Sequence, residues 1–341
     1  MKRLFLLAAT VALFATSCEK QEIRNEVIKE IGFTSNVEKQ TKAIITGEDY
    51  NTQPFGVYAY GPAVTGDATN MMMENVEISK QTEGWKAATG KYYWPNNPNT
   101  KLSFYAYSPA MTSYVSCVKD KGITLADYVH SDNYLDFMVA TPVANATYET
   151  PNGTAAPNGV GVVPVIFNHQ MTQLKFKFME HSNTGITYTV NTITLDNVYD
   201  QADYDWNASA NWTDFKYSNG TGSSVNVFPV GTQVATGITA KAADATEAAT
   251  LLTTTGITVI PQTIPASAKI TINYTISGTG VATETVTKEV LLSKASVTLP
   301  TWAKNQVVVY NITFSMREIL FAPSVEEWAT ETDGGNLKVE A

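Results

Sequence analysis

The chain has 341 residues, of which 16% are charged, and its 32 acidic and 23 basic side chains give a net charge of −9. That length fits one large domain or two ordinary ones, because single cores stop growing near roughly 250–300 residues. The 11% share of aromatic residues argues against disorder of the whole chain. The acidic balance argues against nucleic acid as a partner, because phosphate neutralisation needs grouped Lys and Arg.

The first 17 residues have the three regions of a secretory signal peptide. Two basic residues precede an apolar run over residues 4–14, which is too short to span a bilayer, and small residues follow. Cys18 comes directly after them, an arrangement similar to a bacterial lipobox, in which the Cys is acylated and becomes the new N-terminus. The alternative is an ordinary signal peptide with a coincidental Cys. We expect export, acylation of Cys18 with chains such as palmitate, and a tether over residues 18–26.

Acylation at Cys18 has two consequences for the rest of the chain. Each buried methylene adds about 0.8 kcal/mol, so more than one acyl chain gives stable anchoring, here to the outer membrane. With Cys18 lipidated, Cys117 is the remaining one of the two cysteines. An intramolecular disulfide is then impossible, and the fold must be held by its cores.

Period-two alternation of apolar side chains recurs along the chain and predicts an all-β fold. It is clearest over residues 102–106, 174–178 and 270–276, and further strand candidates cover residues 55–60, 186–198, 286–292 and 307–314. Turn clusters rich in Gly, Pro, Asn and Ser separate these segments, which is typical of β-sandwiches. Helical periodicity is weak, with short candidates at residues 125–130 and 242–252.

A stretch rich in Pro, Gly and Asn over residues 150–164 divides the chain into two parts of sandwich size. We therefore expect two β-sandwich domains in tandem, residues 27–165 and 166–341, with the boundary near residue 165. Residues 199–225, which contain several Gly and Asn, are expected to form a long surface loop or an irregular edge.

The titratable residues do not form a pattern typical of catalysis. His130, His169 and His181 lack the spacing of a zinc site or a nucleophilic triad, and His169 is expected to pack or to form hydrogen bonds. Three acidic residues over 200–205 could crowd around calcium, but they lack the features of an EF-hand loop, and a solvated acidic loop is the preferred interpretation. Glu326 and Glu327 are adjacent, which does not suit a glycosidase pair. We expect no enzyme activity, no metal and no cofactor.

Aromatic side chains support an alternative function in glycan binding. Residues 92–94 (YYW), Trp206 and Trp212 could offer ring faces to sugars. In a strand-rich protein, however, such residues more often pack in the core or at an edge.

Several short segments, each weak alone, follow one another in order over nearly the whole chain after the signal peptide. They are residues 55–58 (FGVY), 93–95 (YWP), 102–107 (LSFYAY), 167–176 (FNHQMTQLKF), 261–262 (PQ), 325–328 (VEEW) and 333–335 (DGG). Together they resemble the fimbrillin family, the lipoprotein precursors of type V pili in Gram-negative anaerobes of gut and mouth, and in particular its fimbrillin-like (Mfa-like) branch.

The resemblance implies two transthyretin-like β-sandwich domains and assembly by donor-strand exchange. In that family an Arg/Lys-specific protease removes the N-terminal strand of the precursor, and the vacated groove accepts a strand from the next subunit. Such an exchange is a form of β-augmentation, in which main-chain hydrogen bonds complete a sheet while alternate apolar side chains fill a groove.

Both ends of this chain have residues that fit the exchange. Val27, Ile31 and Phe33 fall on one face of a strand that could be removed, although Lys29 interrupts the pattern. Cleavage is expected between Lys42 and Ala43, with Lys39 as an alternative. Near the C-terminus, residues 319–341 contain the candidate donor strand, with the alternating apolar residues Ile319, Phe321, Leu337 and Val339. The alternative for both ends is an ordinary edge strand that never exchanges.

These observations predict a non-enzymatic fimbrial subunit that is lipid-anchored, processed and polymerised by strand exchange, and that contributes to adhesion. The expected partners are fimbrial subunits of the same or a related type, the outer membrane through the lipid at Cys18, a Lys/Arg-specific processing protease, and a host glycan or protein ligand. The alternative is a cell-surface glycan-binding lipoprotein built from β-sandwiches. A surface hydrolase is a third class, but no residues point to it.

Overall fold

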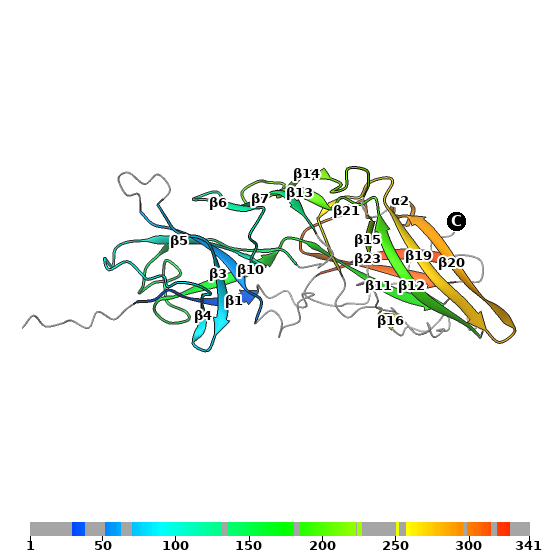
Figure 1. Ribbon diagram of the computed structural model, residues 1–341, viewed down its shortest axis with the longest axis horizontal. Helices are drawn as coiled ribbons and strands as arrows, with labels where there is room; N and C mark the ends of the chain where they lie inside the picture. The colour runs from blue at the N-terminus through cyan, green and yellow to red at the C-terminus, as the bar shows by residue number, and fades with distance from the viewer. Residues whose placement is uncertain are drawn as a thin grey trace, which may run out of the picture.

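The structure is a computed structural model that describes residues 29–37, 52–62, 70–130, 136–180, 185–222, 224–226, 250–251, 257–295, 299–314 and 319–327. The described part is elongated and almost entirely β-structure (Figure 1), with a short helix α2 at Leu292–Ala295. The all-β class predicted from the sequence is therefore confirmed. In this part of the chain, no helix has the length and apolar character needed to cross a membrane.

The first sheet closes on itself. Its strands follow the order β2-β3-β4-β1-β10-β8-β5-β9, and β2 also pairs with β5. The bounds are β1 Gly32–Val37, β2 Phe55–Tyr60, β3 Met71–Gln81, β4 Gly84–Ala87, β5 Leu102–Ser108, β8 Met138–Ala140, β9 Val143–Ala146 and β10 Val162–His169. Within this order β1 lies between β4 and β10 and has a paired neighbour on each side.

A second, four-stranded sheet lies beside the first and has the order β14-β13-β7-β6. Its strands are β6 Val115–Val118, β7 Gly122–Val129, β13 Gln201–Asp205 and β14 Trp212–Lys216. The expected helix over residues 125–130 is wrong, because those residues belong largely to β7, which forms a hairpin with β6 around the turn at Asp120 and Gly122. Of the two alternatives for residues 199–225, the surface loop is wrong and the irregular edge is confirmed, because β13 and β14 pair with a register shift at the edge of this sheet. Tyr204 and Trp212 of these strands pack into a core.

Strand β2 is buried on both faces and joins these two sheets. Its Phe55, Val57 and Ala59 belong to the core enclosed by the first sheet. Its Tyr58 and Tyr60 belong to a separate core beneath β6, β7, β13 and β14. The hydroxyl of Tyr60 donates a hydrogen bond to the carbonyl oxygen of Cys117 over 2.7 Å. The polar end of this buried ring is therefore satisfied by β6.

The remaining strands enclose a third core at the other end of the molecule (Figure 1). One sheet contains β11 Thr172–Glu180, β16 Thr250–Leu251, β17 Ile257–Val259, β22 Gln306–Phe314 and β23 Ile319–Glu327. The facing sheet has the order β15-β12-β19-β20, with β12 Ile186–Asp196, β15 Ser224–Asn226, β19 Lys269–Gly278 and β20 Val281–Leu291. A small ribbon pairs β18 Gln262–Thr263 with β21 Thr301–Trp302. Of the helix candidate at 242–252, the described residues 250 and 251 lie in β16.

The boundary expected near residue 165 falls inside β10, which pairs with β1 and β8 over its whole length. The chain therefore leaves the first sheet only after His169. The second sheet draws β7 from one side of this point and β13 from the other. The division into two tandem domains stays a prediction.

Cys117 is buried on β6, and this burial raises the pKa of its thiol to about 12. Since the thiolate is the reactive form, we expect almost no modification by a disulfide reagent such as Ellman's reagent at pH 8 in the folded protein. The measurement uses the chain from residue 19 onward, which retains Cys117 alone. One thiol should react after denaturation in guanidinium. Rapid and complete reaction of the native protein would show that this core is open.

Candidate functional site

Strand β1 overlaps the end of the segment that the sequence indicated as removable, residues 27–33, and it is inserted within the first sheet. It runs parallel to β10 through six register pairs, from Gly32 opposite Val162 to Val37 opposite Phe167. On its other side it pairs antiparallel with β4 at Phe33 and Trp85. Figure 1 shows β1 beside β10 and β4. It is therefore an interior strand, not an edge strand.

The inward face of β1 completes the core of the first sheet. Ile31 and Phe33 are 2% and 4% exposed, and Val37 packs partly buried against the same core. The Phe33 ring meets the rings of Phe55 and Phe104 edge-to-face, with centroid distances of 6.1 and 5.9 Å. Such pairs contribute about 0.5–1.5 kcal/mol beyond the area they bury. Phe33 lies in β1 and Ile31 lies directly before it, while Val27 lies outside the described residues; that these residues belong to a removable strand stays a prediction.

Backbone hydrogen bonds hold β1 from both sides. The N–H of Gly32 donates to the carbonyl oxygen of Gly161 next to β10, over 3.1 Å. The N–H of Ile31 donates in the opposite direction, to the carbonyl oxygen of Tyr92, over 2.9 Å. The N–H of Trp94 donates to the carbonyl oxygen of Lys29, over 2.8 Å. Removal of β1 would therefore uncover backbone groups on two sides and an aromatic core beneath.

The expected cleavage point and part of the expected donor segment are not placed. Lys42 and Ala43 follow the end of β1 by a few residues and lie outside the described part of the chain, as do Cys18, Leu337 and Val339. Their roles stay predictions.

Ile319 and Phe321 belong to β23, which stands at the end of its sheet. This strand pairs antiparallel with β22 through nine register pairs, from Ile319 opposite Phe314 to Glu327 opposite Gln306. The described part of the candidate donor segment, Ile319–Glu327, is therefore docked on its own sheet as an edge strand. Only one of its two sides is paired with another described strand, and such an edge is a ready template for pairing with a second chain.

His130 and His169 make structural contacts. The Nδ1 atom of His169 bonds the Oδ2 atom of Asp136, and both side chains are buried. The predicted packing and hydrogen-bonding role of His169, the last residue of β10, is confirmed. The Nε2 atom of His130 lies 2.9 Å from the carbonyl oxygen of Thr258 in β17, so this ring joins two sheets. His181 lies outside the described residues.

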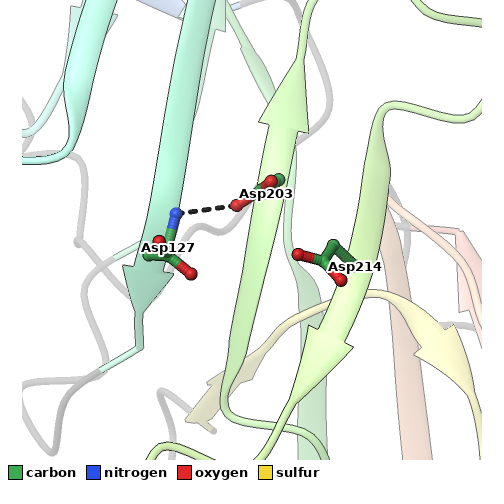
Figure 2. Close-up of side chains that lie close together, drawn as sticks. All are labelled: Asp127, Asp203 and Asp214. Carbon is green, nitrogen blue, oxygen red and sulfur yellow. Dashed lines mark hydrogen bonds between the residues drawn. The ribbon is translucent and has the colours of Figure 1, made fainter.

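The acidic residues at positions 200, 203 and 205 do not cluster, so the calcium alternative gains no support, and the preferred acidic loop is in part strand β13. Asp203 lies instead beside Asp127 and Asp214 on the neighbouring strands (Figure 2), with one carboxylate oxygen of each within 4.8 Å of the others. The Nζ atom of Lys216 lies 3.0 Å from Asp127 and 2.6 Å from Asp214, and hydrogen bonds to these two carboxylates raise the pKa of the lysine. This ammonium group offsets the repulsion within the exposed cluster.

The other two of these three acidic residues, Asp200 and Asp205, form hydrogen bonds with nearby residues. Asp200 accepts a hydrogen bond from the hydroxyl of Ser218 at 2.6 Å, and Asp205 accepts one from the N–H of Asn207 at 2.8 Å. These contacts stabilise turns beside β13, so neither carboxylate joins the cluster in Figure 2.

The tryptophans proposed for glycan binding are mostly buried. Trp94 and Trp212 are 3% and 6% exposed, and their indole N–H groups donate to the carbonyl oxygens of Gly161 and Gln170. Trp206 packs partly buried against the core of the second sheet. In the described part of the chain, Tyr93 and Tyr114 are the exposed aromatic residues, and the ring of Tyr114 packs edge-on against Tyr128. No platform of coplanar exposed rings is formed by these residues.

The burial of Phe33 allows the contribution of β1 to be measured. Because a buried Phe loses its transfer energy and leaves a cavity, Phe33→Ala should lower the free energy of unfolding by about 3–5 kcal/mol. Asn36 is exposed on the same strand, so Asn36→Ala should change it by no more than about 0.5 kcal/mol. Urea denaturation of the two variants measures both values. Equal effects would show that β1 does not fill the core.

Comparison with known proteins agrees with this architecture. The family model described as fimbrillin-like matches residues 41–328. A search of curated proteins found no match. Among solved structures, a fimbrial protein from Bacteroides vulgatus is 22% identical with a TM-score of 0.60, covering 88% of this chain and 99% of that one. A "putative cell adhesion protein" from Bacteroides uniformis is 15% identical with a TM-score of 0.53, covering 89% of this chain and 99% of that one. Because the fimbrillin-like family model matches residues 41–328, most of the chain, the chain belongs to the fimbrillin-like family.

Proposed function

We propose that this protein is a non-enzymatic subunit of a cell-surface fimbrium that polymerises by donor-strand exchange after its N-terminal strand is removed. The observation that carries the proposal is the position of β1, inserted between β10 and β4 with Ile31 and Phe33 in the core. Family membership supports the fimbrial role, and the fimbrial protein from Bacteroides vulgatus shares the fold.

Loss of β1 would leave the backbone and side chains that contact it without partners, and this is the physical basis of the proposal. The backbone groups of β10 that face β1 would lose their partners, and Phe55 and Phe104 would lose the ring that packs against both. A strand from another subunit that restores both kinds of contact is therefore strongly favoured. Its release requires a whole strand to unzip, so the assembled fibre is expected to be kinetically stable.

The processing and anchoring steps complete the proposal. Acylation at Cys18 holds the precursor at the outer membrane, and a Lys/Arg-specific protease cuts between Lys42 and Ala43, beyond the end of β1. The cut separates the lipid and β1 from the rest of the subunit. The donor then comes from the C-terminal segment, of which Ile319–Glu327 is docked on β22 as an edge strand.

A stalk or adapter role follows from the presence of both a removable strand and a candidate donor strand. Contact with a host glycan or protein is a further part of the proposed adhesive function. The alternative, a dedicated glycan-binding lipoprotein, loses support because Trp94 and Trp212 are buried and hydrogen-bonded.

Limited digestion of the chain from residue 19 onward with a Lys/Arg-specific protease tests this function. We expect one cut after Lys42 by intact mass, followed by a ladder of oligomers that resists SDS, because each subunit then offers a groove and a donor. Replacing both nearby basic residues, as in Lys39→Gln with Lys42→Gln, should abolish the cut and the ladder. The single change Lys39→Gln is the matched control and should preserve both.

Two results would contradict the proposed function. The trimmed protein could stay monomeric at high concentration, or the ladder could persist when residues 319–341 are deleted. In the first case the chain does not polymerise by itself, and in the second its C-terminal segment is not the donor.

A further inference from the structure

Strand β20 is an open edge of the sheet β15-β12-β19-β20. Among the described strands it pairs with β19 alone (Figure 1), and its side chains are exposed at residues 281–285 and 287–289. With 11 residues and no proline, it is the longest edge strand in the described part of the chain. Soluble proteins usually shorten or interrupt such an edge, because a long one is a template for pairing with another chain.

The backbone groups of β20 that point away from β19 can be identified. The N–H of Leu292, directly after β20, donates to the carbonyl oxygen of Ala268 over 2.9 Å, in the same register as the paired strands. In an antiparallel ladder the bonded positions alternate along each strand. The even-numbered residues over 284–290 therefore bond to β19. The outward-pointing N–H and C=O groups belong to the odd-numbered residues Thr285, Thr287 and Glu289.

The charges of β20 select one register for pairing with a second copy. Two antiparallel copies must place outward-pointing groups opposite each other, so a two-fold axis passes through one residue of the strand. With the axis at Val286, Glu284 of each copy is opposite Lys288 of the other. With the axis at Thr285 or Thr287, neither charge is opposite its complement. With the axis at Glu284 or Lys288, that residue is opposite its own copy.

We propose that two copies of this protein associate by antiparallel pairing of their β20 strands about a two-fold axis at Val286, which joins two four-stranded sheets into one. This association uses neither β1 nor the C-terminal segment and needs no cleavage. Regular pairing covers residues 284–288, because the register of β20 shifts between Glu284 and Val281. A contact of this length is expected to give a reversible dimer that forms at high local concentration.

The side chains on the inner face of the sheet fit this pairing. Val286 and Val290 pack partly buried against the third core, so Val286 would meet its own copy beside an apolar surface. Even-numbered positions form the non-hydrogen-bonded pairs of the new contact, in which opposite side chains come closest. Glu284 and Lys288 of the two copies are therefore within reach of an ion pair on each side of the axis.

The outer face of the sheet carries hydroxyl groups that also fit. The Nδ2 atom of Asn273 donates to the Oγ1 atom of Thr287 over 2.9 Å, and the Oγ1 atoms of Thr275 and Thr285 lie 3.3 Å apart. In the proposed register Thr285 is opposite Thr287 of the second copy. Opposed threonines are a favourable pair in antiparallel sheets, so this face adds no repulsion at the axis.

Charge reversal tests the proposed register. Glu284→Lys places like charges opposite each other on both sides of the axis, and Lys288→Glu does the same. We expect each variant alone to raise the dissociation constant of the dimer at least about tenfold, measured by sedimentation velocity on the uncleaved chain from residue 19 onward. An equimolar mixture of the two variants should recover the association, because every reversed charge then meets its complement. Recovery also shows that both variants are folded.

Disulfide trapping gives a second readout. Val286→Cys lies at the axis, where the Cβ atoms of opposite residues are about 4.5–5.5 Å apart, so mild oxidation should produce a covalent dimer. Thr285→Cys is the matched control. Position 285 is more exposed, but it is opposite Thr287 and not its own copy, so it should give at least about tenfold less covalent dimer. Burial raises the pKa of Cys117 to about 12 and keeps this thiol unreactive.

Three results would overturn the inference. The parent chain could stay monomeric at about 1 mM, Glu284→Lys could dimerise as strongly as the parent, or Thr285→Cys could cross-link more than Val286→Cys. Because these measurements use the uncleaved chain, none of these results bears on the proposed strand exchange. Conversely, loss of the SDS-resistant ladder after deletion of residues 319–341 should leave this dimer intact.

Discussion

The insertion of β1 between β10 and β4 is the contact on which the rest of the first sheet depends. Through it the sheet closes, and through Phe33 the rings of Phe55 and Phe104 acquire a common partner. A barrel-like sheet without this strand would have two unpaired edges above an apolar core, which is the least tolerable state for a soluble β-protein. If β1 is removed as proposed, the contacts that stabilise the subunit would therefore have to be restored by another strand.

Strand β2, which is buried on both faces, supports the core that β1 covers. Its inward residues meet β1, while Tyr58 and Tyr60 are covered by the second sheet. Gly56 lies where the ring of Tyr107 crosses β2, and a Cβ atom at that position would collide with the ring. Because both faces of this strand are packed, the core beneath β1 would keep its shape if β1 were removed. This rigidity supports the proposed exchange, since a preformed groove favours the binding of one strand.

Local patterns predicted the strands but not their partners. Alternation identified β19 correctly, since Ile270, Ile272 and Tyr274 are buried in the third core. It did not show that Gly32 pairs with Val162, because that pairing joins segments far apart in the sequence, nor that Asp203 lies beside Asp127 and Asp214. For residues 199–225 the Gly and Asn content left a loop and an irregular edge equally open, and the structure shows an irregular edge in which Tyr204 and Trp212 are core residues. Alternation indicated an N-terminal strand that overlaps the start of β1, whereas the burial of β1 between β10 and β4 required the structure.

A cryo-electron microscopy structure of the fibre formed after cleavage would test the central claim most directly. The account predicts that the strand between β10 and β4 belongs to a neighbouring subunit and runs parallel to β10, with an aromatic side chain between Phe55 and Phe104. Density for the subunit's own residues 32–37 in that position, continuous with the rest of its chain, would contradict it.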